Sequence, residues 1–460
     1  MARDVHRPPT LTPPIEALLS PFLRFARMEA AGGILLLTST VAALIWANSP
    51  WEQIYHSMLN LQVSIGFGRF FLSASQHQWI NDGLMSIFFF LAGLEIKREV
   101  LIGELSSVKQ AAFPLISALG GTLVPALSYV AFNHDSPLRQ GWGIPIATDI
   151  AFALGVLALL GDRIPLSLKI FVTALAIADD IIAVSVIAVV YSEHIHLLSL
   201  AVGLFGLGLS LGANLLGVRR PAVYALIGVC VWCAVLKSGL HATISGVLLA
   251  FTIPARTYLD RDDFLESGRC LLDQYALTCP RSSEEHAAIS ALVAQCEMVE
   301  SPLHRIEHGL QPWVSFLVMP LFAFANAGVQ ILGKVTLAAK HPVTLGTALG
   351  LFLGKPIGIF LFALCATKAK LTVLPSGISW SQVFGAGWVC GIGFTMSLFM
   401  ATLAFGDGDV LHMAKIGTLA GSIAAGISGG MFLACKGDDL YRLDPTGKGR
   451  QKHGAMEAIR

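Results

Sequence analysis

Residues 174–190 read Ala-Leu-Ala-Ile-Ala-Asp-Asp-Ile-Ile-Ala-Val-Ser-Val-Ile-Ala-Val-Val, and the adjacent carboxylates Asp179 and Asp180 are the only charged side chains in this run. With residues 166–173 the apolar stretch reaches about 25 residues, enough for a helix to cross a hydrocarbon core of roughly 30 Å. The two acids would then lie near the middle of the membrane. A charge at that depth is costly, so an acid pair there indicates a functional site.

The composition is that of a membrane protein. Of 460 residues, 54% are hydrophobic and 13% are charged, and the mean hydropathy is +0.68, whereas roughly 25% of residues are charged in a soluble domain. The net charge of +1 gives no reason to expect nucleic acid as a partner.

Residues 1–14 lack the form of a cleaved signal peptide, so we expect them to be retained. Cys230 and Cys233 have C-x-x-C spacing within an apolar run, and we expect no metal or redox cofactor there.

Apolar segments follow one another along most of the chain, which predicts an all-α polytopic membrane protein with about twelve transmembrane helices. Lys and Arg are concentrated in the connections on one side, which is the cytoplasmic side by the positive-inside rule. Both termini are therefore expected in the cytoplasm. The predicted spans are residues 29–48, 78–101, 112–132, 142–160, 166–191, 198–217, 221–236, 239–254, 312–333, 344–366, 382–405 and 413–435.

One connection is longer and more polar than the others. Residues 255–304 form a predicted cytoplasmic insert, in which residues 282–293 have the pattern of a capped amphipathic helix. Residues 51–78 mix aromatic and β-branched residues with glycine, which favours a short hairpin on the outer surface. The chain thus divides into a cytoplasmic segment at 1–28, transmembrane helices 1–8 at 29–254, the insert, helices 9–12 at 305–435 and a cytoplasmic tail at 436–460.

The span before the acid pair is predicted to be interrupted. Pro145 cannot donate a backbone hydrogen bond and disturbs the preceding turn, so helical structure should break just before Thr148 and Asp149. A carboxylate at such a break can cap the exposed N–H groups of the next helix, or it can take part in ion binding. The sequence leaves both roles open for Asp149.

A second interruption is predicted near the end of the chain, where Gly391 and Gly393 lie in the middle of the apolar run 382–405. Glycines are common in membrane helices as packing residues. The alternative is an unwound stretch whose free carbonyls face a water-filled cavity. Two interrupted spans in corresponding positions indicate a transporter site built from inverted repeats.

Lys355 is a cation at mid-membrane depth with mostly apolar residues on either side. The sequence around it is not a phosphate-binding loop, because Pro356 stands where Ser or Thr is required. A Lys side chain can extend its amine to the membrane surface, but the long apolar flanks favour a buried partner. The candidates for that partner are Asp149, Asp179 and Asp180.

Charged side chains gather at the cytoplasmic ends of two spans, around Glu95 in the first half of the chain and Glu307 in the second. Such charges are usual where a helix meets the lipid headgroups. At the mouth of a proton-linked site they could also act as a gate or sense pH. The full set of candidates for a response to pH is Asp82, Glu95, Arg98, Glu99, His241, Glu307 and His308.

Seven segments together resemble the bacterial NhaA sodium/proton antiporters, and they are spread over nearly the whole membrane region. This family is among those from which the link between interrupted helices and transport sites was drawn, so the two indications are not independent. The segments are FFFLAGLEIKRE at 88–99, IATDIAFALG at 146–155, ALAIADD at 174–180, LKSGLHAT at 236–243, LFAFANAGV at 321–329, GKPIGI at 354–359 and GIGFTMSLF at 391–399.

The resemblance implies twelve helices, two interrupted helices that cross near the site, and electrogenic exchange of cytoplasmic sodium for a larger number of protons. Asp180 would be the main ion-binding carboxylate, with Asp179 as its partner and Lys355 as a counter-charge to Asp179. The hairpin would help a homodimer to form. The insert departs from the compact connection of the family without touching the transport residues. The crossing would contain Thr148, Asp149, Gly391 and Gly393, and the charged candidates above would fall in regions associated with pH response.

The leading interpretation is therefore a sodium or lithium/proton antiporter of the bacterial inner membrane, which is not an enzyme. It would export sodium by competition of cation and protons for the Asp pair, with activation at alkaline pH, and would serve pH homeostasis and salt tolerance. One alternative is an intramembrane aspartyl protease, but that needs two carboxylates sharing a proton, whereas a helix turns about 100° between adjacent residues. The other is a passive cation channel, against which a Lys–Asp pair in a closed site argues. The expected partners are sodium or lithium ions, protons, lipid and a second copy of the chain.

Overall fold

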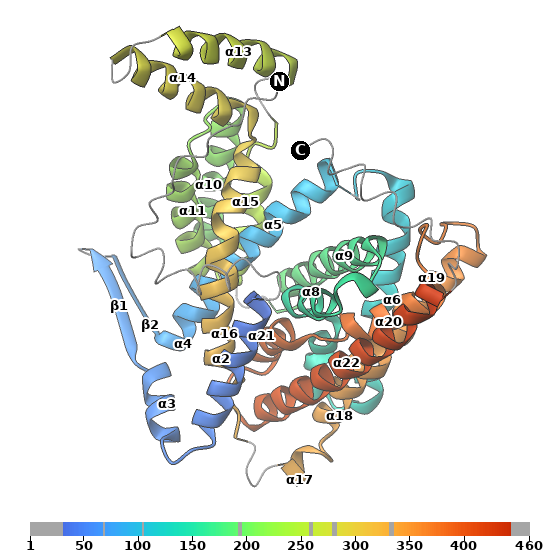
Figure 1. Cartoon of the computed structure of the whole chain (residues 1–460). Helices are drawn as coiled ribbons and strands as arrows, with labels where there is room; N and C mark the ends of the chain where they lie inside the picture. Colours follow the sequence, from blue (N-terminus) through green and yellow to red (C-terminus); the bar gives the residue numbers. More distant parts are fainter. Residues whose placement is uncertain are drawn as a thin grey trace.

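The computed structural model describes residues 31–442 apart from 68–69, 104, 192–195, 257–260, 278–282 and 331–334. The predicted N-terminal segment 1–28 and residues 443–460 of the predicted tail lie outside the described residues. Helices make up almost all of the described chain, and they form a bundle with one long helical hairpin set apart from it (Figure 1). The predicted all-α polytopic architecture is confirmed.

The chain begins its described course with two helices that meet at 117°, α2 (Ala31–Ala47) and α3 (Glu52–Leu59). A two-stranded antiparallel ribbon follows, formed by β1 (Gln62–Phe67) and β2 (Phe70–Ser75). It extends from one side of the bundle in Figure 1. The hairpin predicted between the first two spans is therefore confirmed.

Several spans are built from consecutive helical pieces, because π-helical turns are inserted into them. These turns widen the helix locally and are often found at functional sites. The second span contains α4 (Gln76–Gln78), η1 (Trp79–Leu84) and α5 (Met85–Leu101). The later ones contain α15 (Pro302–Trp313), η4 (Val314–Val318) and α16 (Met319–Ala327), and then α18 (Pro342–Leu349), η5 (Gly350–Gly354) and α19 (Lys355–Lys368).

A further group of helices is continuous, and most of them are long and apolar. They are α6 (Val108–Phe132), α9 (Leu166–Val190), α10 (Leu197–Leu215), α11 (Pro221–Leu236), α12 (Thr243–Thr252) and α22 (Asp409–Arg442), with the short connecting turns η3 (Gly161–Arg163) and α17 (Val335–Ala338).

Two spans are interrupted where the sequence predicted a break. The first consists of α7 (Ser136–Arg139), the 3-10 helix η2 (Gln140–Ile146) and α8 (Ile150–Leu159), with extended backbone at Ala147 and Asp149. The second consists of α20 (Trp380–Cys390) and α21 (Phe394–Phe405), whose axes differ by 48°. Both interruptions are confirmed.

Eight helical runs among the described residues are long and apolar enough to cross a membrane, or ten if each sharply bent pair is one span. The predicted number of twelve is not confirmed. Two further apolar helices, α11 and α12, coincide with predicted spans but have only 16 and 10 residues. Their short length leaves the exact number a prediction.

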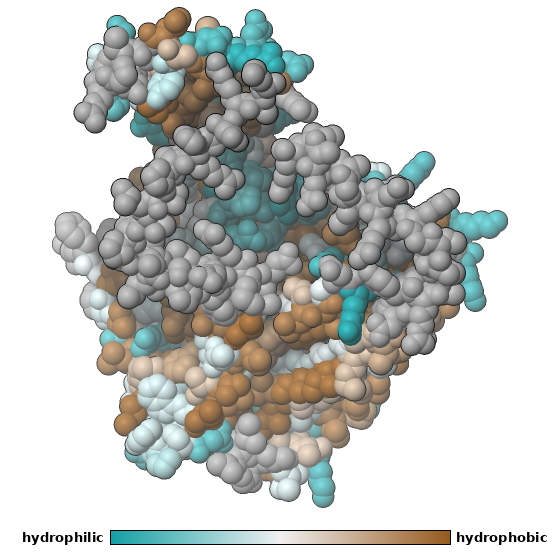
Figure 2. Space-filling view, in the orientation of Figure 1, coloured by the Kyte–Doolittle hydropathy of each residue, from teal (hydrophilic) through white to brown (hydrophobic). Residues whose placement is uncertain are grey.

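The predicted insert contains two helices, α13 (Arg261–Leu277) and α14 (Ser283–Val299), which form the hairpin set apart from the bundle (Figure 1). Its surface has hydrophilic and hydrophobic patches side by side, whereas the bundle carries a broad hydrophobic face (Figure 2). The two ends of the insert meet, because the N–H of Leu303 donates a hydrogen bond to the carbonyl of Pro254 at 3.1 Å. The insert is thus attached at one narrow base.

The helix with the acid pair lies at the centre of the bundle. In α9, 61% of the most apolar 18-residue stretch is buried, more than in any of the other seven helical runs that are long enough to cross a membrane. At the periphery the pattern is reversed, and Leu198 and Phe205 of α10 are 82% and 75% exposed. Apolar side chains therefore face outward, as expected for contact with lipid, while the carboxylates are enclosed.

Candidate functional site

The two central acids have different surroundings. Asp179 and Asp180 lie in the middle of α9, and each is 1% exposed. Their side chains leave the helix about 100° apart. Asp179 is held by a Lys and a Thr, whereas Asp180 lines a cavity. The pair therefore forms two separate parts of one site.

Lys355 is the buried partner of Asp179. Its Nζ lies 2.9 Å from Asp179 Oδ2, and the same oxygen accepts a hydrogen bond of 2.7 Å from Thr148 Oγ1. The Lys amine also donates to the carbonyl of Ile146, at the end of η2. Of the three acids that the sequence offered as partners, the structure pairs Lys355 with Asp179.

Glycines before Lys355 allow the close packing that brings it to Asp179. A Cβ on Gly354 would lie 3.0 Å from Pro125 Cα, and a Cβ on Gly350 would lie 2.8 Å from Pro145 Cβ. Side chains at these positions would push η5 away from α6 and η2. The π-helical turn can therefore lie against both, with Lys355 as the first residue of α19.

The two interrupted spans cross at their breaks. Thr148 Oγ1, whose single proton is shared with Asp179 Oδ2, also lies 2.9 Å from the carbonyl oxygen of Cys390, and the N–H of Asp149 donates a hydrogen bond of 2.7 Å to the carbonyl of Ile392. Gly393 makes this approach possible, because a Cβ there would lie 2.9 Å from the carbonyl oxygen of Ala147. The unwound backbone of one span thus satisfies groups of the other.

Gly391 has a similar role on the other side of the second break. A Cβ at this position would lie 2.5 Å from the carbonyl oxygen of Leu351 in η5. The glycine lets the end of α20 lie against the π-helical turn that precedes Lys355. Gly391 and Gly393 are therefore close-approach residues at an unwound stretch, as the packing interpretation predicts. The carbonyls of Cys390 and Ile392 in this stretch are not free, because Thr148 Oγ1 and the Asp149 N–H bind them.

Asp149 caps two helices at once. Its Oδ1 accepts a hydrogen bond of 3.2 Å from the N–H of Phe152 in α8, and its Oδ2 accepts one of 3.1 Å from the N–H of Thr395 in α21. The hydroxyl of Thr395 donates to the same Oδ2. Both α8 and α21 point their N-termini, the positive ends of their dipoles, at this carboxylate. The described contacts thus favour the capping role for Asp149.

On the other side of the crossing, a positive charge balances the partial negative charge at the C-terminal end of a helix. The C-terminal end of η2 exposes the carbonyl of Ile146, a partly negative group, and Lys355 donates to it. An anion at the helix N-termini and a cation at the C-terminal end together neutralise the partial charges of the broken helices. Such broken helices are a recurring way of building an ion site at mid-membrane.

Asp180 lies in the wall of a cavity of about 540 Å³. The cavity is also lined by Glu95 and Arg98 of α5 and by Glu307 and His308 of α15. Four predicted candidates for pH response therefore share one cavity with the main predicted ion-binding carboxylate. The sequence placed them at a membrane end and did not predict that a single space joins them to the acid pair.

An ion-pair network holds the charged end of this cavity. Arg98 Nη1 lies 3.1 Å from Glu307 Oε1, and Arg98 Nη2 lies 3.1 Å from Glu99 Oε1. Glu307 is 5% exposed. Glu99 thus belongs to the cluster through Arg98, although it is not among the cavity-lining residues.

Two predicted candidates lie elsewhere. Asp82 is in η1, where its backbone carbonyl accepts a hydrogen bond of 3.1 Å from Trp232 Nε1. His241 Nε2 lies 2.7 Å from the carbonyl of Tyr191, just beyond the end of α9. Neither residue lines the cavity at Asp180.

Sequence reasoning assigned no role to Thr395, although it lies in the quoted run 391–399. The sequence feature that could have predicted a role for Thr395 is the pair of hydroxyl residues Thr395 and Ser397 directly after an unwound stretch. Backbone and carboxylate groups need hydrogen-bond partners at such a place. Ser397 Oγ donates a hydrogen bond of 2.7 Å to the carbonyl of Ile144. Both hydroxyls therefore join the second interrupted span to the first.

The two central acids each have a carboxylate oxygen that can still accept a proton or a cation. Oδ1 of Asp179 and Oδ1 of Asp180 are buried and have no hydrogen-bond partner among the described residues. An unpartnered buried carboxylate oxygen is unfavourable unless it receives a proton or a cation. Carboxylate oxygens suit hard cations. A tightly held metal ion would need more ligands, and the described residues include no cluster of three or more His, Cys, Asp or Glu that could hold one. The acid pair thus fits a small, hard cation or protons.

Comparison with known proteins gives consistent matches. The family described as Na+/H+ antiporter 1 matches residues 23–433. A Koribacter versatilis protein named Na(+)/H(+) antiporter NhaA is 64% identical over 420 residues, which cover 91% of this chain and 92% of that protein. A protein of the same name from Oleidesulfovibrio alaskensis is 46% identical over 426 residues, 91% of this chain and 95% of that protein. One from Escherichia coli O1:K1 is 45% identical over 414 residues, 89% and 97% of the two chains.

Proposed function

Because the chain belongs to the Na+/H+ antiporter 1 family, we propose that it exports cytoplasmic sodium or lithium ions from the bacterial cell in exchange for external protons. The relatives carry the name Na(+)/H(+) antiporter NhaA, and their similarity covers nearly the full length of this chain. Such a protein is a transporter of the inner membrane and not an enzyme.

The observation that carries the proposal is the asymmetry of the acid pair. Asp179 is occupied by Lys355 and Thr148, whereas Asp180 lines the cavity with its Oδ1 unpartnered. Asp180 is therefore the carboxylate that can exchange a proton for a cation through the cavity. Asp179 contributes its own unpartnered Oδ1 as a second ligand.

In this mechanism, protons and sodium compete for the same oxygens. With the site open to the cytoplasm, sodium replaces protons at Asp180 and Asp179. After the site has opened to the outside, external protons displace the sodium ion. Lys355 stabilises the negative charge of Asp179 whenever that carboxylate holds neither a proton nor the sodium ion, and the crossing at Thr148 and Asp149 holds the backbone around the pair.

We further propose that the exchange is electrogenic and active at alkaline pH. Two carboxylates release up to two protons for one bound sodium ion, so the two loaded forms differ in charge. The network at Glu95, Arg98, Glu99, Glu307 and His308 lies on the cavity or directly beside it, where a change of charge would alter the entry of cations.

The arrangement in the membrane is also part of the proposal. Both termini and the insert would lie in the cytoplasm, because Lys and Arg are concentrated on that side of the sequence. The ribbon of β1 and β2 presents an exposed edge in the described structure, since each strand has only the other as its neighbour. Exposed edges favour pairing with another chain, which supports a homodimer.

The two rival functions have less support. A protease of the aspartyl type needs two carboxylates that share a proton, but here Asp179 is bound to Lys355. A passive channel does not need a buried ion pair beside a carboxylate that binds protons.

One experiment separates these functions. Purified protein in proteoliposomes should take up sodium against its gradient when a pH gradient is imposed, and should stop when that gradient is removed. Sodium movement that continues to equilibrium regardless of the pH gradient would indicate a channel and would contradict the proposal.

A further inference from the structure

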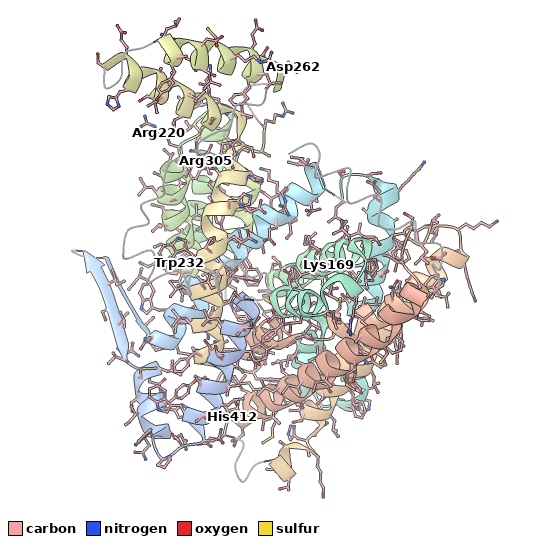
Figure 3. All side chains as sticks on the ribbon, in the orientation of Figure 1. Lys169, Arg220, Trp232, Asp262, Arg305 and His412 are labelled. Carbon is pink, nitrogen blue, oxygen red and sulfur yellow. The ribbon has the colours of Figure 1, made fainter. Side chains whose placement is uncertain are left out.

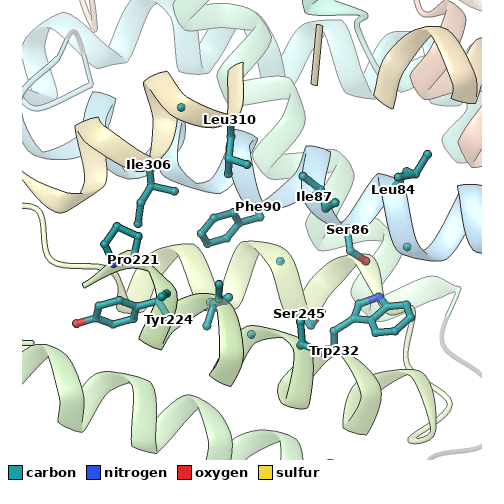
Figure 4. A pocket seen from close by; sticks show the side chains of 18 of the residues that line it. Leu84, Ser86, Ile87, Phe90, Pro221, Tyr224, Trp232, Ser245, Ile306 and Leu310 are labelled. Carbon is teal, nitrogen blue, oxygen red and sulfur yellow. The ribbon is translucent and has the colours of Figure 1, made fainter. Parts of the chain in front are cut away.

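Helix α15 lies between two cavities of different character. An apolar one of about 930 Å³ is enclosed by α5, α11, α12 and α15, and Ile306 and Leu310 of α15 face Phe90 of α5 across it (Figure 4). His308 of the same helix lines the other cavity, the one at Asp180. One face of α15 is thus apolar, and another lies at the charged end of the cavity that contains the acid pair.

Two histidines lie close together on α15. The rings of His304 and His308 have their centroids 4.2 Å apart, because residues four apart lie on the same side of a helix. His304 is in the first turn, next to Arg305, which Figure 3 shows at the end of α15 nearer the α13–α14 hairpin. The His304 side chain is 43% exposed and His308 is exposed, so a solute can reach both rings.

A carboxylate determines which nitrogen of His304 is available. His304 Nδ1 lies 3.0 Å from Glu300 Oε1, and because the carboxylate accepts, Nδ1 carries the proton. The lone pair of the neutral ring is then on Nε2. Carboxylates in this position orient the imidazoles of metal sites and make them stronger ligands. Among the described residues no hydrogen bond or ion pair occupies the His308 ring, so each histidine offers a nitrogen to a ligand.

The sequence of this turn has the spacing of a metal site. Residues 304–308 read His-Arg-Ile-Glu-His, and two histidines four apart on one helix occur in zinc sites, with the H-x-x-E-H form in one class of zinc enzymes. A catalytic zinc site has three protein ligands. Here Glu307 is paired with Arg98 at 3.1 Å, and the described residues include no group of three His, Cys, Asp or Glu that could hold a metal ion. The pattern therefore fits binding of an ion and not metal catalysis.

We propose that His304 and His308 bind a divalent transition-metal ion at the charged end of the cavity, and that the bound ion slows the access of sodium to Asp180. Imidazole nitrogens suit Zn²⁺, Ni²⁺ and Cu²⁺, and in zinc sites they lie about 2.0–2.1 Å from the ion. Rings with centroids 4.2 Å apart are close enough for one ion to contact both. Water molecules complete the coordination, so binding is reversible.

The effect on transport follows from charge. A bound ion adds two positive charges beside a cavity that also contains Arg98, and positive charges repel a cation that approaches through the same space. The inference goes beyond the proposed exchange of sodium and protons, because the bound ion is neither transported nor required for that exchange.

Binding of Ni²⁺ to purified protein with a histidine-free affinity tag tests the site. Ni²⁺ is the probe because Zn²⁺ also suits cysteine thiolates. Isothermal titration calorimetry should show one more Ni²⁺ per chain for the wild-type protein than for His304→Gln or His308→Gln. Mg²⁺, which prefers oxygen ligands, should not displace it. Glu300→Gln should bind Ni²⁺ about tenfold more weakly, as expected for loss of an orienting carboxylate.

His56→Gln is the matched control. His56 Nε2 lies 3.8 Å from Oε1 of Glu52, four residues before it, and its side chain is 43% exposed, as in His304. Asn60 stands where the second histidine would be. This variant should bind Ni²⁺ as the wild-type protein does, and all variants should unfold at the same temperature without metal. Equal binding of Ni²⁺ by His304→Gln, His308→Gln and the wild-type protein would overturn the proposal.

The effect on transport is measured in everted vesicles, whose outer surface is the cytoplasmic face. The ratio of sodium-dependent proton flux with Ni²⁺ to that without it should fall in the wild-type protein and in His56→Gln, and should be unchanged in His304→Gln. An equal fall in His304→Gln would overturn the proposed control of access. Calorimetry does not depend on transport, so a failure of the metal site can be told apart from a failure of the proposed exchange.

Discussion

Lys355 Nζ lies 2.9 Å from Asp179 Oδ2, and neither side chain is exposed to solvent. Burying two charges costs free energy that their attraction only partly returns, so a buried pair is weak evidence for stability in itself. Its effect here is on the neighbouring residue. Because Lys355 balances the charge of Asp179, Asp180 is the acid of the pair that has no counter-charge beside it.

We expect Asp180→Asn to abolish sodium-dependent proton movement while the protein remains folded and inserted. Asn keeps the shape of the side chain but cannot release a proton or carry the charge that balances sodium. Proton flux in everted vesicles is the measurement. Asp135→Asn, at an exposed site before α7, is the matched control and should behave as wild type. Near-normal exchange by well-expressed Asp180→Asn would remove Asp180 from the mechanism.

Lys355→Ala should lower both exchange and stability, because it leaves Asp179 buried without its counter-charge. Loss of one partner of a buried pair costs on the order of 3–5 kcal/mol, which thermal unfolding in detergent would detect. Lys368→Ala, at the exposed end of α19, should have little effect. Adding Asp179→Asn to Lys355→Ala should restore part of the stability, and an unchanged unfolding temperature of the single variant would contradict the pairing.

Asp149 allows its two possible roles to be separated. Asn can still accept a hydrogen bond at a helix N-terminus, whereas replacement of a cap by Ala typically costs about 0.5–2 kcal/mol. We therefore expect Asp149→Asn to retain most of the exchange activity and Asp149→Ala to unfold at a lower temperature. A loss of exchange in Asp149→Asn as complete as in Asp180→Asn would show that Asp149 carries ions.

Much of this site could be predicted from single positions in the sequence. Pro145 located the first break, since a missing N–H affects the helix wherever it folds. The uncharged surroundings of Asp179 and Asp180 marked the acid pair, because the cost of a charge in lipid does not depend on details of packing. Local chemistry was sufficient for these features.

Other features depended on the three-dimensional arrangement and could not be predicted in this way. Three acids are possible partners of Lys355 on sequence grounds, and packing of the π-helical turn η5 against Pro125 and Pro145 selects Asp179. The contact of Thr395 with Asp149 joins residues 246 positions apart. The shared cavity at Asp180 requires α5, α9 and α15 to be placed side by side, which no local pattern specifies.

Replacement of residues 256–300 by a short polar linker should leave sodium/proton exchange intact. The ends of the insert already meet at the hydrogen bond between Leu303 N–H and the Pro254 carbonyl, so a short connection closes the gap, and changes in loop length cost little. Sodium-dependent proton flux of the deletion variant should match that of the full-length protein. Complete loss of exchange in a correctly inserted deletion variant would place part of the mechanism in α13 and α14.

The apparent affinity for sodium should rise with cytoplasmic pH, because the cation and the protons compete for Asp180 and Asp179. At acidic pH the carboxylates are occupied by protons, and as the pH rises sodium needs to displace fewer of them. If about two protons return for one sodium ion, each cycle moves one charge, worth about 2.3 kcal/mol per 100 mV. A membrane potential, negative inside, should then expel sodium even without a pH gradient. Vesicles with a clamped potential test both points: an affinity that does not change with pH would refute competition, and a flux that does not respond to the potential would refute unequal exchange.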